Sequence, residues 1–135
     1  MFEITSIAAK DTFTLELVNA NDEPLKDDAG KACSVTIYGP GSKEHQRAQA
    51  KRTQRMMDQL AKKGKMKLTA EEQQREQAEF LAACTASING WAYKGETTPE
   101  AILAAYSDPS IGFIADQVTK AMGDWANFMG SSAKG

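Results

Sequence analysis

The segment that most constrains the fold is VTIYGPGSKEHQRAQAKRTQR, residues 35–55, because the spacing of its apolar residues changes abruptly. Before Gly39 apolar and polar residues alternate, which is the period of a half-buried strand. The Gly-Pro-Gly that follows removes a backbone donor and permits unusual dihedral angles, so the strand is expected to end there. Ser42 then predicts a helix N-cap, because its hydroxyl can accept an orphan backbone N–H of the first turn.

A second strand is predicted at residues 13–18, where Phe13, Leu15 and Leu17 alternate with more polar neighbours. The intervening segment, ANDEPLKDDAGK, is rich in residues that tolerate turn dihedral angles. The two strands therefore predict an N-terminal β-hairpin over about residues 12–40. A lone hairpin is marginally stable in water, so its apolar face must pack on the helices of this chain or on a strand of another subunit.

Four helices are predicted after the hairpin. The first is basic and ends near residue 62 or 63, before Gly64. The second opens with a capping box of Thr69 and Glu72 and is expected to continue to about residue 90. Its apolar face is formed by residues at helical spacing, namely Leu81, Cys84, Ile88 and Trp91.

The remaining two helices lie in the last third of the chain. Thr98 and Pro99 mark the start of one, since proline at the first helical position loses no hydrogen bond. The last helix carries the most regular amphipathic pattern, formed by Ile111, Ile114, Val118, Met122, Trp125 and Met129.

The predicted fold class is α+β, with an N-terminal β-hairpin packed on a C-terminal bundle of about four helices. The 135 residues, of which 41% are hydrophobic, suffice for one domain with its own core. That domain is expected to span residues 1–130, with the helices at about 43–129, and residues 130–135 (GSSAKG) have the composition of a flexible tail.

The formal net charge of −2 is distributed unevenly along the chain. Residues 43–67 carry nine basic and two acidic residues, whereas the segments on both sides are acidic. This pattern indicates charge pairing with the neighbouring acidic helix or between subunits. Nine positive charges would also suit a nucleic acid, but the turn AKKGKMK does not resemble a helix-turn-helix, so nucleic-acid binding is the weaker hypothesis.

The sequence offers little for catalysis. His45 is the single histidine and is expected on an exposed first helical turn, without a nearby His or Cys companion. The acidic pairs Asp22-Glu23 and Asp27-Asp28 lack the spacing of a calcium loop. The glycines before residue 42 lack both phosphate-loop spacings. We therefore predict no enzyme activity, no cofactor and no metal.

Cys33 and Cys84 are far apart and form no CxxC pattern, so two buried reduced thiols are expected, with one disulfide as the alternative. No apolar run approaches the roughly 20 residues that span a bilayer, so no membrane association is expected. The N-terminal sequence MFEITSIAAKD lacks the pattern of a signal peptide. Cytoplasm is the expected location.

The order of these segments resembles the tail assembly chaperones of long-tailed bacteriophages over about residues 12–129. The series comprises the turn NDEPLKDDAGK, the strand end VTIYGPGS, the basic KEHQRAQAKRTQR, then FLAACTASINGW, TPEAILAAYSDPSIGFIADQV and WANF. The matching positions are Gly39, Ser42, Arg47, Arg52, Trp91, Pro99, Asn127 and Phe128. The loop AYKGET departs from the family pattern because it is short and less acidic, which leaves any partner contact by this loop in doubt.

The resemblance implies a protein that is not an enzyme and that binds the tape measure protein, the long helical chain that fixes tail length. It would keep that client soluble in the host bacterial cytoplasm while the tail tube assembles, and it would be absent from the mature virion. A longer form produced by ribosomal frameshifting near the C-terminus is also implied.

Such a role requires accessible apolar side chains that adapt to a client, and methionine is the most adaptable. The candidates for partner binding are Met56, Met57, Leu60, Met66, Met122, Trp125 and Met129. A long client would favour a homo-oligomer, because repeated engagement raises the effective affinity. The candidates for charged self-association are Arg47, Lys51, Arg52, Arg55, Glu71, Glu72, Glu76 and Glu79.

Two other functions agree with parts of the sequence. A structural component of the virion, in the tail or at the head–tail connector, would use the hairpin to extend the sheet of a neighbouring subunit. A small DNA-binding regulator would use the basic residues of segment 43–67.

Overall fold

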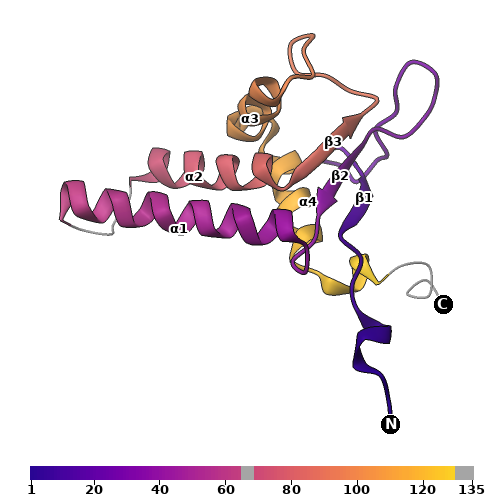
Figure 1. The fold of residues 1–135 in the computed structure, drawn as a ribbon. Helices are drawn as coiled ribbons and strands as arrows, with labels where there is room; N and C mark the ends of the chain where they lie inside the picture. Colours follow the sequence, from indigo (N-terminus) through magenta and orange to yellow (C-terminus); the bar gives the residue numbers. More distant parts are fainter. Residues whose placement is uncertain (65–68, 130–135) are drawn as a thin grey trace.

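The computed structural model describes residues 1–64 and 69–129 as a three-stranded antiparallel sheet combined with four α-helices (Figure 1). The sheet order is β1-β2-β3, and the long helices α1 and α2 project from it side by side. The predicted α+β class is confirmed. Residues 65–68 and the predicted tail at 130–135 lie outside the described residues.

The predicted hairpin is confirmed. Strand β1 (Thr12–Glu16) pairs antiparallel with β2 (Ser34–Tyr38), so that Thr12 lies opposite Tyr38 and Glu16 opposite Ser34. Within the long connection, isolated bridges join Val18 to Pro24 and Lys26 to Ala32. The turn segment thus folds back on itself and prolongs the ladder beyond the two strands.

The helix expected to reach residue 90 is shorter than predicted, because α2 ends at Ala83 and strand β3 (Thr85–Asn89) follows at once. Strand β3 pairs antiparallel with β2, and Ile88 lies opposite the fully buried Val35. The Thr85 hydroxyl donates to the Leu81 carbonyl (2.8 Å), which satisfies one acceptor of the last helical turn. Pairing with β2 therefore outweighs the helical spacing of the apolar residues.

Helices α1 (Lys43–Lys63) and α2 (Ala70–Ala83) have the caps that the sequence predicts. The Ser42 hydroxyl accepts the His45 N–H at 3.0 Å, and Gly64 ends α1 in the left-handed conformation at φ 71°. Thr69 and Glu72 form the capping box of α2, with both hydrogen bonds present. These local signals fix where each helix begins.

Helix α3 (Pro99–Ser107) begins at Pro99 after the Thr98 cap, as predicted. The last helix, α4 (Gly112–Met122), ends earlier than predicted, and a separate 3-10 turn, η3 (Trp125–Phe128), follows Asp124. Trp125 and Met129 are therefore not on α4. The break has a local cause, since the Asp124 carboxylate accepts the Ala126 N–H (3.0 Å) and starts a new turn.

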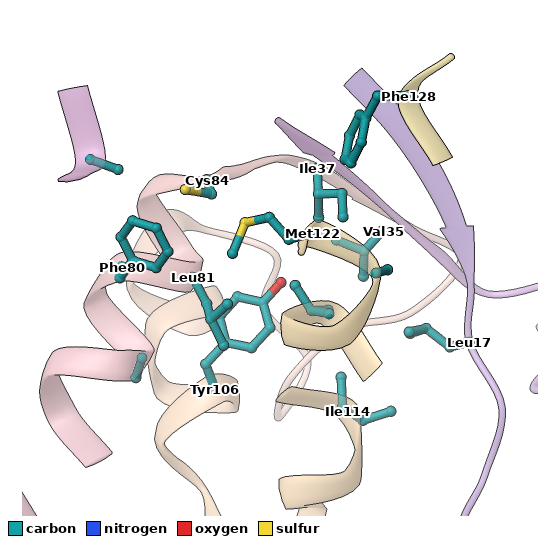
Figure 2. Packing of buried hydrophobic residues seen from close by; sticks show 14 residues of the cluster. Leu17, Val35, Ile37, Phe80, Leu81, Cys84, Tyr106, Ile114, Met122 and Phe128 are labelled. Carbon is teal, nitrogen blue, oxygen red and sulfur yellow. The ribbon is translucent and has the colours of Figure 1, made fainter. Parts of the chain in front are cut away.

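One hydrophobic core joins the sheet to the helices. Figure 2 shows Met122 of α4 between the sheet residues Val35 and Ile37 and the helical residues Leu81 and Tyr106. The Tyr106 hydroxyl is hydrogen-bonded to Thr85 (2.7 Å), so the buried phenol keeps a polar partner. The apolar face of the predicted hairpin thus packs on the helices of its own chain.

Candidate functional site

The structure separates the predicted partner-binding residues into two groups. Met56 and Leu60 are half-buried on α1, and Met57 beside them is 54% exposed. Met122 is buried in the core, Trp125 is 55% exposed, and Met129 is half-buried near the C-terminal end. Met66 lies outside the described residues. No single surface therefore collects these side chains, and Met122 presents none of its side chain to a partner.

Exposed apolar side chains gather instead at one end of the molecule. Six large hydrophobic residues of the described chain are exposed, and one of them is Met57 on α1. The other five belong to this end of the molecule: Met1, Phe2, Ile4, Ile7 and Trp125. Gly41 lies close to both Trp125 and Ala9, so residues 1–9, the N-terminal arm, leave the body of the protein beside the Trp125 ring. Figure 1 shows the arm extending away from the sheet.

The apolar arm was not selected from the sequence as a binding element. Its residues sit in the segment MFEITSI, which contains a short 3-10 turn, η1 (Ile4–Ile7), capped by Glu3. The sequence signal that could have identified the arm is the cluster of large apolar residues ahead of the first predicted strand. Its exposure could not be derived from spacing, because a short segment can equally pack on the core.

Part of the predicted charge pairing is intramolecular. Arg55 Nε of α1 lies 2.8 Å from Glu76 Oε1 and 3.0 Å from Glu79 Oε2 of α2. Arg75 makes a weaker contact with Glu79 at 3.6 Å, four residues along the same helix. The two ion pairs of Arg55 hold the basic helix against the acidic one, so three of the candidates for self-association, Arg55, Glu76 and Glu79, serve the fold itself.

Arg52, another of these candidates, packs against an aromatic ring. Its guanidinium carbon lies 5.0 Å from the centroid of Phe80, which is a cation–π distance. The His45 ring meets the same phenyl ring edge to face, with the centroids 5.3 Å apart. The three side chains form one cluster between α1 and α2.

His45 corrects a prediction, since it is buried rather than solvated, with 9% of its surface exposed. Its Nδ1 atom has no hydrogen-bond partner within the described residues. Burial lowers the pKa of His45 below its ordinary value of 6.5, because desolvation disfavours the imidazolium. The burial of His45 could not be predicted from the polar residues around it, because the phenyl ring that covers it comes from a different helix.

Other cations of α1 face solvent. Lys43, Arg47 and Lys51 are exposed and four residues apart, so they form a basic stripe along one side of the helix. On α2, Glu71 is exposed, whereas Glu72 belongs to the capping box. Of the predicted candidates for charged self-association, Arg47, Lys51 and Glu71 are the exposed ones and are placed to meet another molecule.

A hollow of about 300 Å³ with mainly apolar walls lies between the long β1–β2 connection, the segment after β3 and the start of α4. Leu17 and Leu25 line one side, and Phe113 and Ile114 line another. Trp91 and Tyr93 complete the wall, with Lys26 as the charged residue of the lining. We call this hollow the apolar pocket.

Side-chain hydrogen bonds fix the walls of the apolar pocket. Trp91 Nε1 donates to the Ser34 carbonyl (3.0 Å), and the Tyr93 hydroxyl donates to Asp108 Oδ2 (2.9 Å). Gln117 of α4 accepts the Val18 N–H (2.9 Å) and donates to the Val18 carbonyl (2.7 Å). Three segments distant in the sequence are thereby locked together, so the pocket exists before any ligand binds.

A larger groove of about 610 Å³ lies along β3, between the end of α2 and α3. Ala86 and Ile88 of β3 face Ile102 and Leu103 of α3 across it. Because β3 is an outer strand of the sheet, the groove borders backbone groups that no strand of the described chain pairs.

Cys33 and Cys84 are buried free thiols, and burial raises the pKa of Cys84 to about 12. Within residues 1–64 and 69–129, no group of three His, Cys, Asp or Glu side chains is arranged to hold a metal ion. No helix in the same ranges has both the length and the apolarity required to cross a membrane.

Comparisons of the chain with protein-family models, with curated protein sequences and with solved structures found no match.

Proposed function

We propose that this protein is a non-enzymatic tail assembly chaperone of a long-tailed bacteriophage, which binds the tape measure protein and keeps it soluble in the host bacterial cytoplasm. The observation that carries the proposal is a pair of large apolar side chains left exposed on a folded, charged domain, namely Met57 and Trp125. Aromatic residues and methionine are enriched at protein–protein interfaces relative to the rest of the surface, so these side chains support contact with another protein. The family resemblance of residues 12–129 supplies the identity of that molecule.

The apolar surfaces of this protein suit a helical client. A tape measure chain exposes apolar stripes that associate with one another unless they are covered. Trp125 at one end and Met57 on α1 offer two separate contacts, and a client with a long repeating stripe can engage both. The exposed stripe of Lys43, Arg47 and Lys51 adds attraction for acidic residues of the client.

The test is co-expression with the long helix-rich tape measure protein encoded nearby in the same genome. We expect the client to move from the insoluble fraction into a soluble complex that contains this chain. The double variant Trp125→Ser, Met57→Ser should lose the complex without losing the fold, because both side chains are more than half exposed. The matched control is Ala50→Ser, an exposed position of α1 that carries no large apolar group.

A client that stays insoluble with the wild-type chain, and with any longer frameshifted form, would contradict the proposal. Mass spectrometry of purified particles gives a second measurement, since a chaperone is absent from the mature virion.

A structural role in the virion is the second candidate, and the exposed edge of β3 favours it. A neighbouring subunit could add a strand there and extend the sheet around a ring. Recovery of the chain in stoichiometric amounts from purified particles would favour this role over the chaperone. DNA binding is a weaker candidate, because Arg52 and Arg55 are engaged between α1 and α2.

A further inference from the structure

The N-terminal arm and the apolar pocket have complementary chemistry. The arm presents Phe2 and Ile4, which are 69% and 65% exposed, with the carboxylate of Glu3 between them. The pocket presents apolar walls, and the charged residue Lys26 belongs to its lining. The apolar side chains of the arm therefore match the apolar walls of the pocket, and the carboxylate of Glu3 matches the positive charge of Lys26.

We propose that the arm of one copy of this protein docks in the apolar pocket of a second copy, with Phe2 or Ile4 inserted between Leu25, Trp91 and Phe113, and Glu3 paired with Lys26. The inference is independent of the proposed function, because both contact surfaces belong to this chain and no client is involved.

The charged groups are available for this contact. Lys26 makes no ion pair within the described residues, and its side chain is exposed. Glu3 uses only its Oε2 atom to accept from Thr5, at 2.8 Å from the hydroxyl and 3.4 Å from the backbone N–H. The second carboxylate oxygen can accept the Lys26 ammonium while the first continues to cap η1.

The geometry of one chain favours exchange between copies. Figure 1 shows the arm leaving the end of the molecule near η3, whereas the pocket is built from the β1–β2 connection, the segment after β3 and the start of α4. Along the chain, strand β1 separates the arm from Leu17 in the pocket wall. Since every copy carries one arm and one pocket, the contact forms a closed dimer when two arms exchange, or a larger ring when each arm serves the next copy.

Sedimentation velocity over a range of micromolar protein concentrations is the primary measurement. We expect the wild-type chain to associate with increasing concentration, because a contact of a few residues is smaller than a standard stable interface. The arm variant Phe2→Ser, Ile4→Ser and the pocket variant Ala92→Arg should each remain monomeric. Ala92 is exposed and lines the pocket, so an arginine there fills the hollow without entering the core.

Two controls separate docking from general effects of mutation. Ala50→Arg adds the same charge on the exposed face of α1, and Met57→Ser removes an exposed apolar group elsewhere. Both should associate like the wild type. An equimolar mixture of the arm variant and the pocket variant should form dimers, because it retains one intact arm and one intact pocket.

Charge exchange tests the ion pair. Glu3→Lys and Lys26→Glu should each weaken association about two- to fivefold, the effect of an exposed ion pair, and the combined variant should recover the wild-type constant. A wild-type chain that stays monomeric throughout, an arm variant that still associates, or a variant mixture that stays monomeric would each overturn the inference. These outcomes leave the client co-expression result unaffected, so the two proposals fail separately.

Discussion

Phe128 lies so close to Gly39 that a β-carbon at this glycine would be 2.5 Å from the Cδ1 atom of the phenyl ring. The ring is fully buried and also meets Phe13 of β1 edge to face, with the centroids 5.8 Å apart. The 3-10 turn after α4 thus closes over the end of the hairpin, at the point where β2 leads into α1. Glycine is required here for space, and its conformational freedom is incidental.

The substitution Gly39→Ala should therefore destabilise the protein by about 1–3 kcal/mol, the usual cost of inserting a methyl group into a packed core. Urea unfolding followed by circular dichroism measures the change. Gly112→Ala is the matched control, because a β-carbon at that helical position meets nothing within 4 Å. We expect the control to be neutral or to stabilise by up to about 1 kcal/mol. Equal effects of the two substitutions would contradict the steric argument.

The burial of His45 predicts that stability falls on mild acidification. Its pKa is lowered in the folded state from 6.5, so between these two values the unfolded chain binds more protons. Stability is consequently greatest above pH 6.5 and declines as the pH falls through 6.5 toward the folded pKa. Urea midpoints measured between pH 7.5 and 5 should show this decline.

The variant His45→Leu keeps an apolar contact with Phe80 and removes the titrating ring. Its stability should vary less with pH over the same interval than that of the wild type. The carboxyls with lowered pKa values, Glu3 and Asp108, titrate at lower pH and do not contribute in this interval. If the stability of this variant declines as much as that of the wild type, the pH dependence comes from another group.

Arg55 should contribute more to stability than Arg75, although both approach the same glutamate. Arg55 contacts two carboxylates across the α1–α2 interface and has 32% of its side chain exposed, whereas Arg75 is 75% exposed. We expect Arg55→Met to cost about 1–2 kcal/mol and Arg75→Met at most about 0.5 kcal/mol. Urea unfolding of the two variants, at low salt and at about 1 M salt, measures both effects. A loss for Arg55→Met no larger than for Arg75→Met would show that the interhelical pair is not stabilising.

Cys84 should be chemically silent in the folded protein. Because its pKa is raised to about 12, only about one thiol in ten thousand is ionised at pH 8, and the thiolate is the reactive form. Cys33 is also buried, and its thiol donates to the Gly90 carbonyl at 3.4 Å. Iodoacetamide should therefore modify neither residue until urea unfolds the chain.

The variant Ala50→Cys provides the control for the labelling experiment, since it places a thiol on the exposed face of α1. This thiol should react within the time in which the native cysteines do not. Rapid modification of Cys84 in the native protein would show that the core opens far more often than its packing indicates.

Helix starts and turns were predictable because their causes lie within a few residues. Ser42, the Thr69–Glu72 capping box and Thr98-Pro99 all cap helices as predicted, since each cap satisfies backbone groups of its own first turn. The antiparallel hairpin followed from two alternating segments and the turn residues between them. The sequence by itself therefore determined the hairpin, the capped helix starts and the α+β class.

Only the tertiary structure decided the features that depend on distant partners. Residues 85–89 have apolar neighbours at helical spacing, yet they form β3 because β2 offers a partner about 50 positions earlier in the chain. The same holds for His45, which is buried by Phe80, and for the apolar pocket, whose walls come from three separated segments. Local hydrogen bonds are encoded by neighbours, whereas burial and pairing depend on which surfaces meet after the chain has folded.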